Sequence, residues 1–468
     1  MTDDVVSEDR TASGVFWVQG GNEVAGAVEF ADDGYALRLS GFCFPPKQVE
    51  ILDGGAIRYG SAPDQIAADF AARVILGRLD DESLVTLLDA HMQPGPDVTS
   101  SYAQFFTGKR WLHGAHISGD DEEIHGIRWS WPVLASAVSW TTEAEVPGPV
   151  PGQLAPWVHE QKAGLTFKPE NPSPVGVLIQ DVQVVAAQLL GLWTQKPVPS
   201  PLVTEIYLEA HGWCSYVPEQ EKEQKLLRSS ALLPLRKLGL KEMASWLALA
   251  AKVDPFPYIA NLGPSVVQVD AQVLVTALEG LHRRLHSEVR PFHEVSVRGV
   301  QRAMKAAREA GIRGLVTEGL TDESIADKVL RDALSYVDQP SYHSRIVELV
   351  SPVMEVAPGV CGPELNSWLG IVKKIRNEQS HQLLGAFGSA ELGNYFVATI
   401  SCKWVLVLRI LLEIVSPKDL KEAVTRSQSY IYALANMDEE HIWGEPGALG
   451  TFSAAGSDSD DDNENRIS

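Results

Sequence analysis

The chain has 468 residues, of which 45% are hydrophobic and 21% charged, a composition that excludes a wholly disordered, collagen-like or membrane-embedded protein. The length predicts two or three domains with sizeable cores. The cysteines Cys43, Cys214, Cys361 and Cys402 stand far apart, so they provide neither a CxxC zinc pair nor a disulfide framework. This spacing favours a reducing, cytoplasmic location.

The formal net charge of −22 is unevenly distributed along the chain. Residues 1–267 carry a net charge of −14 and residues 438–468 carry −8, whereas residues 268–437 hold 19 basic and 19 acidic groups. A neutral block can still bind phosphates through local clusters of Arg and Lys, but a global basic footprint is absent. The composition therefore argues against broad, sequence-blind coating of nucleic acid.

Neither the N-terminus nor the apolar segments predict a membrane anchor. Residues 1–13 are acidic and lack an apolar core, so we expect a flexible N-terminus and not a signal peptide. The most apolar stretch, from Trp404 to Val415, is too short to span a bilayer and is interrupted by Arg409 and Glu413.

The first half of the chain has the pattern of strands and turns. Short runs mix aromatic, β-branched and polar residues between turn formers, at 14–19, 23–30, 35–40 and 84–89, and apolar alternating runs resume at 175–179 and 204–208. These runs predict a β-rich, sandwich-like or curved-sheet domain over residues 14–215. Residues 216–265 follow as a helical connector, in which apolar residues of 222–252 stand near helical spacing.

The second half is predicted to be an all-α bundle over residues 266–437. Leu274, Leu278, Leu281 and Leu285 recur every three or four residues and mark one face of a helix at about 270–288. Further helices are expected at 296–310, 322–337, 342–356, 364–384, 391–415 and 418–436. Residues 438–468 end in dense like charge with little hydrophobic content, which predicts an acidic disordered tail. The expected fold class is thus α+β with separate β-rich and helical domains.

The strongest chemical signal is IVKKIRNEQSHQLL at 371–384, which contains Arg376, Asn377 and His381 in the spacing R-N-x3-H. A histidine that titrates near pH 6.5 can relay protons, and an arginine can bind the anionic phosphorane that forms when a ribose 2′-OH attacks the adjacent phosphorus. These residue types therefore suit RNA cleavage without a metal or cofactor. The alternative interpretation is a helix whose Arg and His are solvated surface groups.

Helix geometry limits how these residues act together. Five steps of about 100° separate Arg376 from His381, so on a continuous helix their side chains point about 140° apart. Either the helix breaks between them, or a twofold symmetric dimer brings two copies of the motif into one cleft. Asn377 and His381 share a face at i and i+4, which lets the Asn amide hold the imidazole, and Lys373 precedes them on that face.

The late R-N-x3-H motif in an all-α bundle resembles the HEPN ribonuclease motif, and other segments resemble ApeA-type anti-phage proteins. DAQVLVTALEGLHRR at 270–284 is similar to their first HEPN helix, and SYHSRIVELV at 341–350 to their middle helix. GAVEF, YALRLSG and LVTLLDA resemble their N-terminal domain, although Ala90 stands where that family has cysteine. The resemblance covers most of residues 14–436.

The resemblance implies a bacterial anti-phage protein that cleaves RNA on infection, acts as a homodimer and senses a phage-derived trigger through its N-terminal domain. It implies catalytic roles for Arg376, Asn377 and His381, and also for Glu279, which it places in their cleft. Spacing alone instead predicts a surface ion pair between Glu279 and Arg283. Lys373, Lys374 and Arg283 are the expected RNA-binding residues. Two alternatives remain open: a catalytically silent HEPN scaffold, and a ligand-binding β-sandwich with a helical oligomerisation module.

Overall fold

A computed structural model describes the protein over residues 10–31, 34–44, 49–51, 57–59, 71–93, 103–131, 140, 142–159, 162–196, 201, 203–217, 231–287, 289–381 and 389–439. The chain divides into two compact units, Met1–Ala251 and Lys252–Ser468, which are described separately. The division falls inside the predicted connector at 216–265. Of the predicted flexible N-terminus at 1–13, residues 10–13 belong to a strand, so that prediction is wrong for them, and residues 1–9 lie outside the described residues. Of the predicted tail at 438–468, residues 438 and 439 end a helix, and residues 440–468 lie outside the described residues. The boundaries predicted for the domains stay predictions.

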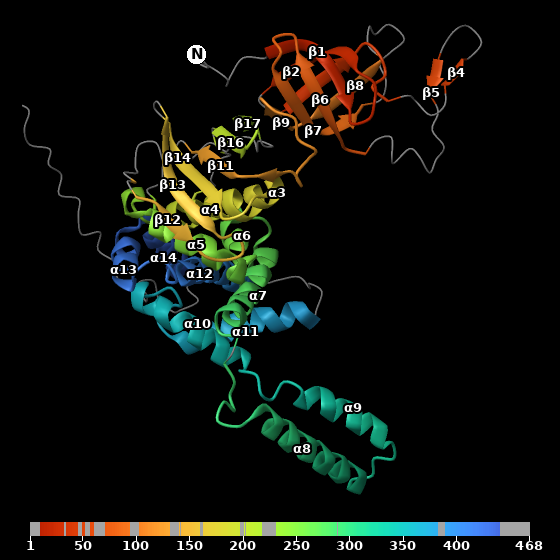
Figure 1. The fold of residues 1–468 in the computed structure, drawn as a ribbon. Coiled ribbons are helices and arrows are strands. Elements are labelled where there is room, and N and C mark those ends of the chain that lie inside the picture. Colours follow the sequence, from red (N-terminus) through yellow and green to blue (C-terminus); the bar gives the residue numbers. More distant parts are fainter. Residues whose placement is uncertain are drawn as a thin grey trace, which may run out of the picture. The chain divides into compact units, whose positions relative to one another are not determined.

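The first unit is β-rich, as predicted (Figure 1). Its strands are β1 (Arg10–Val18), β2 (Val24–Ala31), β3 (Gly34–Leu39), β4 (Val49–Ile51), β5 (Ile57–Tyr59), β6 (Arg73–Leu79), β7 (Leu84–Met92), β8 (Gln104–Gly108), β9 (Arg110–His113), β10 (Glu123–Ile124), β11 (Gly126–Ser130), β12 (Ala144–Val146), β13 (Gly152–His159), β14 (Lys162–Pro169), β15 (Ser173–Pro174), β16 (Val203–Leu208) and β17 (Gly212–Val217).

The main sheet of this unit is curved, and part of it closes on itself. Among the described residues its strand order is β12-β13-β14-β11-β16-β17-β9-β7-β6-β1-β2-β3-β8, and β7 also pairs with β8. The added pairing joins β7, β6, β1, β2, β3 and β8 into a ring, which encloses the buried side chains of Phe16, Val28, Leu37, Ile75 and Val85. The curved sheet, the second of the two forms expected from the sequence, is therefore the one that forms.

One predicted strand is wrong. The apolar run at 175–179 is helical, and α3 (Val175–Leu178), a π-helical turn (Ile179–Val184) and α4 (Val185–Thr194) follow one another without a gap. The apolar run continues as VLIQDVQVVAAQLLGLW, which is longer than a typical strand of about 4–8 residues. A long run with recurring buried residues favours a helix over a strand. The neighbouring prediction at 204–208 is confirmed by β16.

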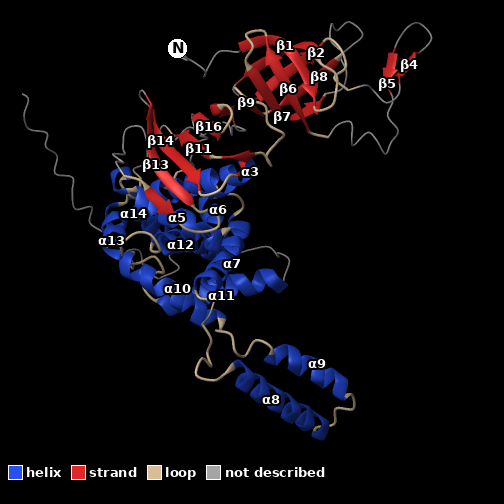
Figure 2. Cartoon of the chain, viewed as in Figure 1, coloured by secondary structure: helices blue, strands red, loops and turns tan. Residues whose placement is uncertain are grey.

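The second unit is helical, as predicted for the C-terminal half (Figure 2). A 3₁₀ turn (Leu235–Lys237) and α5 (Leu240–Val253) lead into it. The helices that follow are α6 (Phe256–Asn261), α7 (Val267–Leu285), α8 (Val297–Thr317), α9 (Glu323–Leu334), α10 (Tyr342–Val356), α11 (Leu365–His381), α12 (Ser389–Leu411), α13 (Pro417–Arg426) and α14 (Gln428–Glu439).

The helix α7 is central to this bundle, because it packs against α12, α10, α11 and α6. Its leucine face is buried, as the spacing of Leu274, Leu278 and Leu281 predicts. The helices α8 and α9 pack on each other, and only Val300 and Ala326 are buried within them. The bundle therefore holds α7, α10 and α11 in mutual contact, and these three helices carry the candidate site.

The single helix predicted at 418–436 is two helices. Ser427 between α13 and α14 has an extended backbone, with φ −74° and ψ 112°, and its hydroxyl accepts a hydrogen bond from the Tyr430 backbone N–H at 3.3 Å. A serine that caps the next helix competes with continuation of the previous one. The chain therefore breaks at this residue although the apolar spacing runs on.

Among the described residues, two helical segments are long and apolar enough to cross a membrane, Val175–Thr194 and Leu392–Leu411. More than half of an 18-residue window in each is buried inside the protein, 56% and 72% respectively. Burial of this extent favours core helices over membrane spans and is in keeping with a soluble protein.

Candidate active site

Glu279 is the centre of a charged cluster formed by three helices. It lies on α7, and its side chain is only 11% exposed. Arg345 of α10 donates from Nη1 to Glu279 Oε1 at 2.6 Å, and Arg283 donates from Nη2 to the same oxygen at 2.9 Å. Arg376 Nη2 of α11 lies 3.0 Å from Glu279 Oε2. Three arginines therefore converge on one carboxylate.

The cluster corrects the simple helical interpretation of Glu279. Its i,i+4 pair with Arg283 exists, but Glu279 is buried and does not belong to a surface ion pair. Burial alone would raise the pKa of Glu279, but the hydrogen bond from Arg283 and the charge of Arg376 outweigh it and lower that pKa. The carboxylate is therefore ionised at neutral pH and holds the guanidinium groups around it.

Arg376 is held on two sides. Besides its ion pair with Glu279, its guanidinium carbon lies 4.6 Å from the centroid of the Tyr342 ring, a cation–π distance. Burial raises the pKa of Tyr342, so its hydroxyl stays protonated. The Arg376 side chain is 39% exposed, so solvent still reaches it. The arrangement orients the guanidinium while leaving it accessible to an anion.

The other predicted site residues of α11 lie between the middle of this helix and its C-terminal end. Lys373, Lys374 and Asn377 are exposed. His381 is the last residue of α11, and its side chain lies outside the described residues. The structure thus brings together Glu279, Arg283 and Arg376, and it arrays the lysines and Asn377 along the same helix.

The helix α11 is continuous from Leu365 to His381. Of the two solutions that the sequence left open, a break between Arg376 and His381 is therefore wrong. The two positions stay five helical steps apart, which places them about 140° from one another around the helix axis. Positions this far apart do not share one face of α11.

Sequence reasoning missed Arg345 and Tyr342 as parts of the cluster. Both lie in the segment SYHSRIVELV, which was noted only for its family resemblance. Arg345 is 6% exposed on its side chain, and Gln339 Oε1 accepts a second hydrogen bond from it at 3.1 Å. A buried arginine in an amphipathic helix is itself a signal, because such a charge requires an acidic partner nearby.

One group among the described residues has the composition and proximity of a metal-binding set: His282, His286 and Glu348. His282 follows Glu279 on α7, His286 is the C-cap residue of that helix, and Glu348 follows Arg345 on α10. Burial lowers the pKa of His282, although its hydrogen bond with Glu348 acts in the opposite direction.

Fold and site together define a β-rich protein with a helical domain that concentrates arginine around a buried carboxylate. Residues 273–420, which span α7 to the first turn of α13, match the family model described as Apea-like HEPN. No curated protein and no solved structure gave a match. Over these residues the match confirms the resemblance to ApeA-type HEPN proteins, and the helical domain is an Apea-like HEPN domain. The resemblance of the N-terminal segments stays a prediction. It supports an anti-phage HEPN-domain protein.

Proposed function

We propose that the protein is an endoribonuclease of anti-phage defence, which cleaves RNA on infection, requires no metal for the chemistry and acts as a homodimer. The observation that carries the proposal is the ion pair between Arg376 and Glu279, because it fixes the arginine of the R-N-x3-H motif in an accessible position. HEPN domains are typically nucleases, and this motif supplies the residue types that RNA cleavage needs.

The charge of the cluster favours a phosphate. Glu279 offsets one positive charge, and Arg283, Arg345 and Arg376 contribute three, so the four side chains together carry +2. Arg283 and Arg376 are 54% and 39% exposed, whereas Arg345 is buried. The two accessible guanidinium groups, with Lys373 about one turn before Arg376 on α11, form the surface to which an RNA backbone would bind. Lys374 stands two helical steps from Arg376, about 160° around the helix, so it would contact RNA from another side of α11.

In the proposed reaction the ribose 2′-OH attacks the adjacent phosphorus and the 5′-oxygen leaves. His381 transfers protons to and from these oxygens, and Asn377 holds its imidazole. Arg376 binds the phosphorane oxygens, where negative charge accumulates. Glu279 is a positioning residue that acts through Arg376. The products carry 2′,3′-cyclic phosphate and 5′-hydroxyl ends.

The continuity of α11 supports a site shared between two protomers. Because Arg376 and His381 diverge by about 140° on one helix, we propose that Arg376 of one protomer and His381 of the other face the same phosphate across a twofold axis. The β-rich domain would sense a phage-derived trigger and keep the site quiet in uninfected cells.

A mixing experiment tests this arrangement. Arg376→Ala and His381→Ala homodimers should each be inactive, but a mixed dimer retains one complete site, made from the intact Arg of one chain and the intact His of the other. Equal mixing with free exchange places half of the molecules in mixed dimers with one of two sites intact, so about a quarter of wild-type RNA cleavage should return. Recovery of no activity on mixing would contradict the shared site.

The same variants distinguish the proposed endoribonuclease from a catalytically silent HEPN scaffold. A scaffold that only binds RNA would protect against phage without cleaving it, so His381→Ala would retain protection. Sequencing RNA ends from infected cells that carry wild type or His381→Ala measures cleavage directly. Cleavage ends that depend on His381 would exclude the scaffold.

A further inference from the structure

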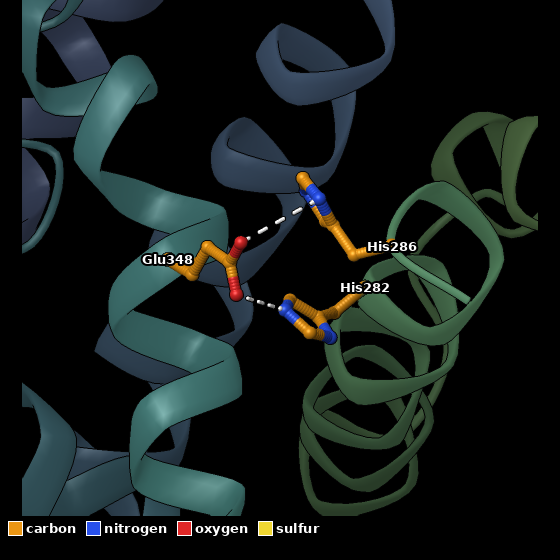
Figure 3. Close-up of side chains that lie close together, drawn as sticks. All are labelled: His282, His286 and Glu348. Atoms are coloured by element: carbon orange, nitrogen blue, oxygen red, sulfur yellow. Dashed lines mark hydrogen bonds and ion pairs between the residues drawn. The ribbon is translucent and has the colours of Figure 1, made fainter. Parts of the chain in front are cut away.

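His282, His286 and Glu348 face one another between α7 and α10 (Figure 3). Glu348 Oε2 lies 2.8 Å from His282 Nε2, and Glu348 Oε1 lies 3.6 Å from His286 Nδ1. The two imidazole rings are neighbours, with centroids 4.8 Å apart. One potential ligand atom from each residue lies within 4.8 Å of the other two.

The spacing of the histidines on α7 explains this geometry. His282 lies in the last turn of α7 and His286 is the C-cap residue that follows it, and the His286 backbone N–H donates to the His282 carbonyl at 2.8 Å, so the two histidines stand one turn apart. Two histidines at this spacing with a carboxylate from a second helix form a ligand set known from zinc sites, in which three protein ligands leave the fourth position to water. Imidazole nitrogen excludes Mg²⁺ and Ca²⁺ as the preferred ions, because both favour oxygen ligands.

An ion held by Glu348 would take the ring nitrogen nearest to that carboxylate, which is Nε2 of His282 and Nδ1 of His286. The opposite nitrogens, His282 Nδ1 and His286 Nε2, are buried and have no hydrogen-bond partner among the described residues. His282 is only 2% exposed on its side chain. Glu348 and His286 are 41% and 27% exposed, and they give an ion a path from solvent.

His282, His286 and Glu348 are separate from the arginine cluster, but like that cluster they join α7 to α10. Glu279 of α7 contacts Arg345 of α10, and His282 of α7 contacts Glu348 of α10. Each second partner lies three residues further along its own helix. An ion at the second contact would therefore fix the same two helices that hold Glu279 and Arg345 together.

We propose that His282, His286 and Glu348 bind one zinc-type divalent transition-metal ion, which ties α7 to α10 and stabilises the HEPN domain. The ion takes no part in RNA cleavage. The site does not depend on the proposed ribonuclease activity, because its ligands are not the residues assigned to the reaction.

The test is a titration of full-length protein, treated with a chelator and then dialysed, with zinc chloride in a calorimeter. His286→Ala and Glu348→Gln change partly exposed side chains, and circular dichroism checks that both variants fold. Wild type should bind one equivalent of zinc that both variants bind about 100-fold more weakly or not at all. The matched control is His343→Ala, which removes an exposed histidine from α10 without touching the group.

Two further readouts identify the ligands and the role. Cobalt in place of zinc should give d–d absorption bands without a thiolate charge-transfer band, because the four cysteines are buried elsewhere. Zinc should raise the Tm of wild type and of His343→Ala, and this rise should be lost in Glu348→Gln. Equal zinc affinity in wild type and Glu348→Gln, or no binding to wild type, would overturn the site. Neither measurement involves RNA, so the metal site and the nuclease proposal fail independently.

Discussion

Replacing Glu279 by Gln should destabilise the helical domain, and the reason lies in Arg345. The substitution keeps the size of the side chain but removes the charge to which three arginines are bound. Arg283 and Arg376 are substantially exposed, so water can solvate them after the change. Arg345 is 6% exposed, and among the described residues Gln339 is the hydrogen-bond acceptor that remains to it. The substitution therefore leaves the buried positive charge of Arg345 without an ionised partner.

The magnitude follows from this count of partners. Removing one partner of a buried ion pair costs about 3–5 kcal/mol, because the other charge stays buried and uncompensated. The Gln amide can still accept one hydrogen bond and Gln339 remains, so the lower end, about 3 kcal/mol, is expected. Arg283→Ala is the matched control on the same carboxylate. It removes an exposed i,i+4 partner and should cost only about 0.3–0.5 kcal/mol.

Hydrogen exchange measured by mass spectrometry on the full chain isolates this effect from unfolding of the β-rich unit. Peptides from α7 and α10 should exchange about 100-fold faster in Glu279→Gln than in wild type, since 1.4 kcal/mol corresponds to a factor of ten. Replacing both partners, as in Glu279→Leu with Arg345→Met, should cost less than the two single changes added together. Equal exchange in Glu279→Gln and Arg283→Ala would refute the buried-pair argument.

The same pair makes the stability of the helical domain depend on pH. The folded pKa of Glu279 is depressed below its ordinary value of 4.5, so its contribution is complete above that value. It is lost as the pH falls through the folded pKa, because protonation then removes the charge. The difference between wild type and Glu279→Gln should accordingly be constant at neutral pH and shrink in acid.

Three predictions concern activity. Arg376→Ala and His381→Ala should each abolish RNA cleavage and phage protection while leaving the dimer folded, and full protection by either in a plaque assay would contradict their roles. Cleavage at moderate temperature should survive EDTA and leave 2′,3′-cyclic phosphate ends, whereas 3′-hydroxyl products that require Mg²⁺ would indicate another mechanism. Deleting the acidic residues 457–468 should raise basal RNA cleavage at low salt, because a tethered polyanion competes for phosphate-binding cations; an unchanged rate at every salt concentration would leave the tail without a regulatory role.

Local periodicity predicted most helices but not every boundary. The leucine spacing identified α7, and the predicted range 342–356 is that of α10, where the Ser341 hydroxyl accepts a hydrogen bond from the Ser344 backbone N–H. The break at Ser427 depends on the hydroxyl of that residue, which accepts a hydrogen bond from the first turn of the next helix. Apolar spacing gives no information about such a hydrogen bond. The sequence predicts a strand at 175–179, because a short apolar window does not distinguish a strand from a buried helix.

The closure of the sheet could not be predicted from local patterns at all. The strand β1 pairs with its neighbour β2, but also with β6, and β9 pairs with β17 about a hundred residues later. Alternation along a strand indicates which side chains share a face, but it does not name the partner strand. The ring through β7 and β8 is therefore a property of the three-dimensional fold.

The candidate site shows the same division between local and non-local information. The R-N-x3-H motif is local, so spacing alone indicated Arg376, Asn377 and His381. The contacts that orient Arg376 are non-local, because Glu279 lies about a hundred residues before it and Tyr342 belongs to another helix. His282 illustrates the limit most clearly. Its bond to Glu348 arises because α7 and α10 pack against each other, and the same packing pairs Glu279 with Arg345. A change that slides one helix past the other would therefore disturb both contacts together.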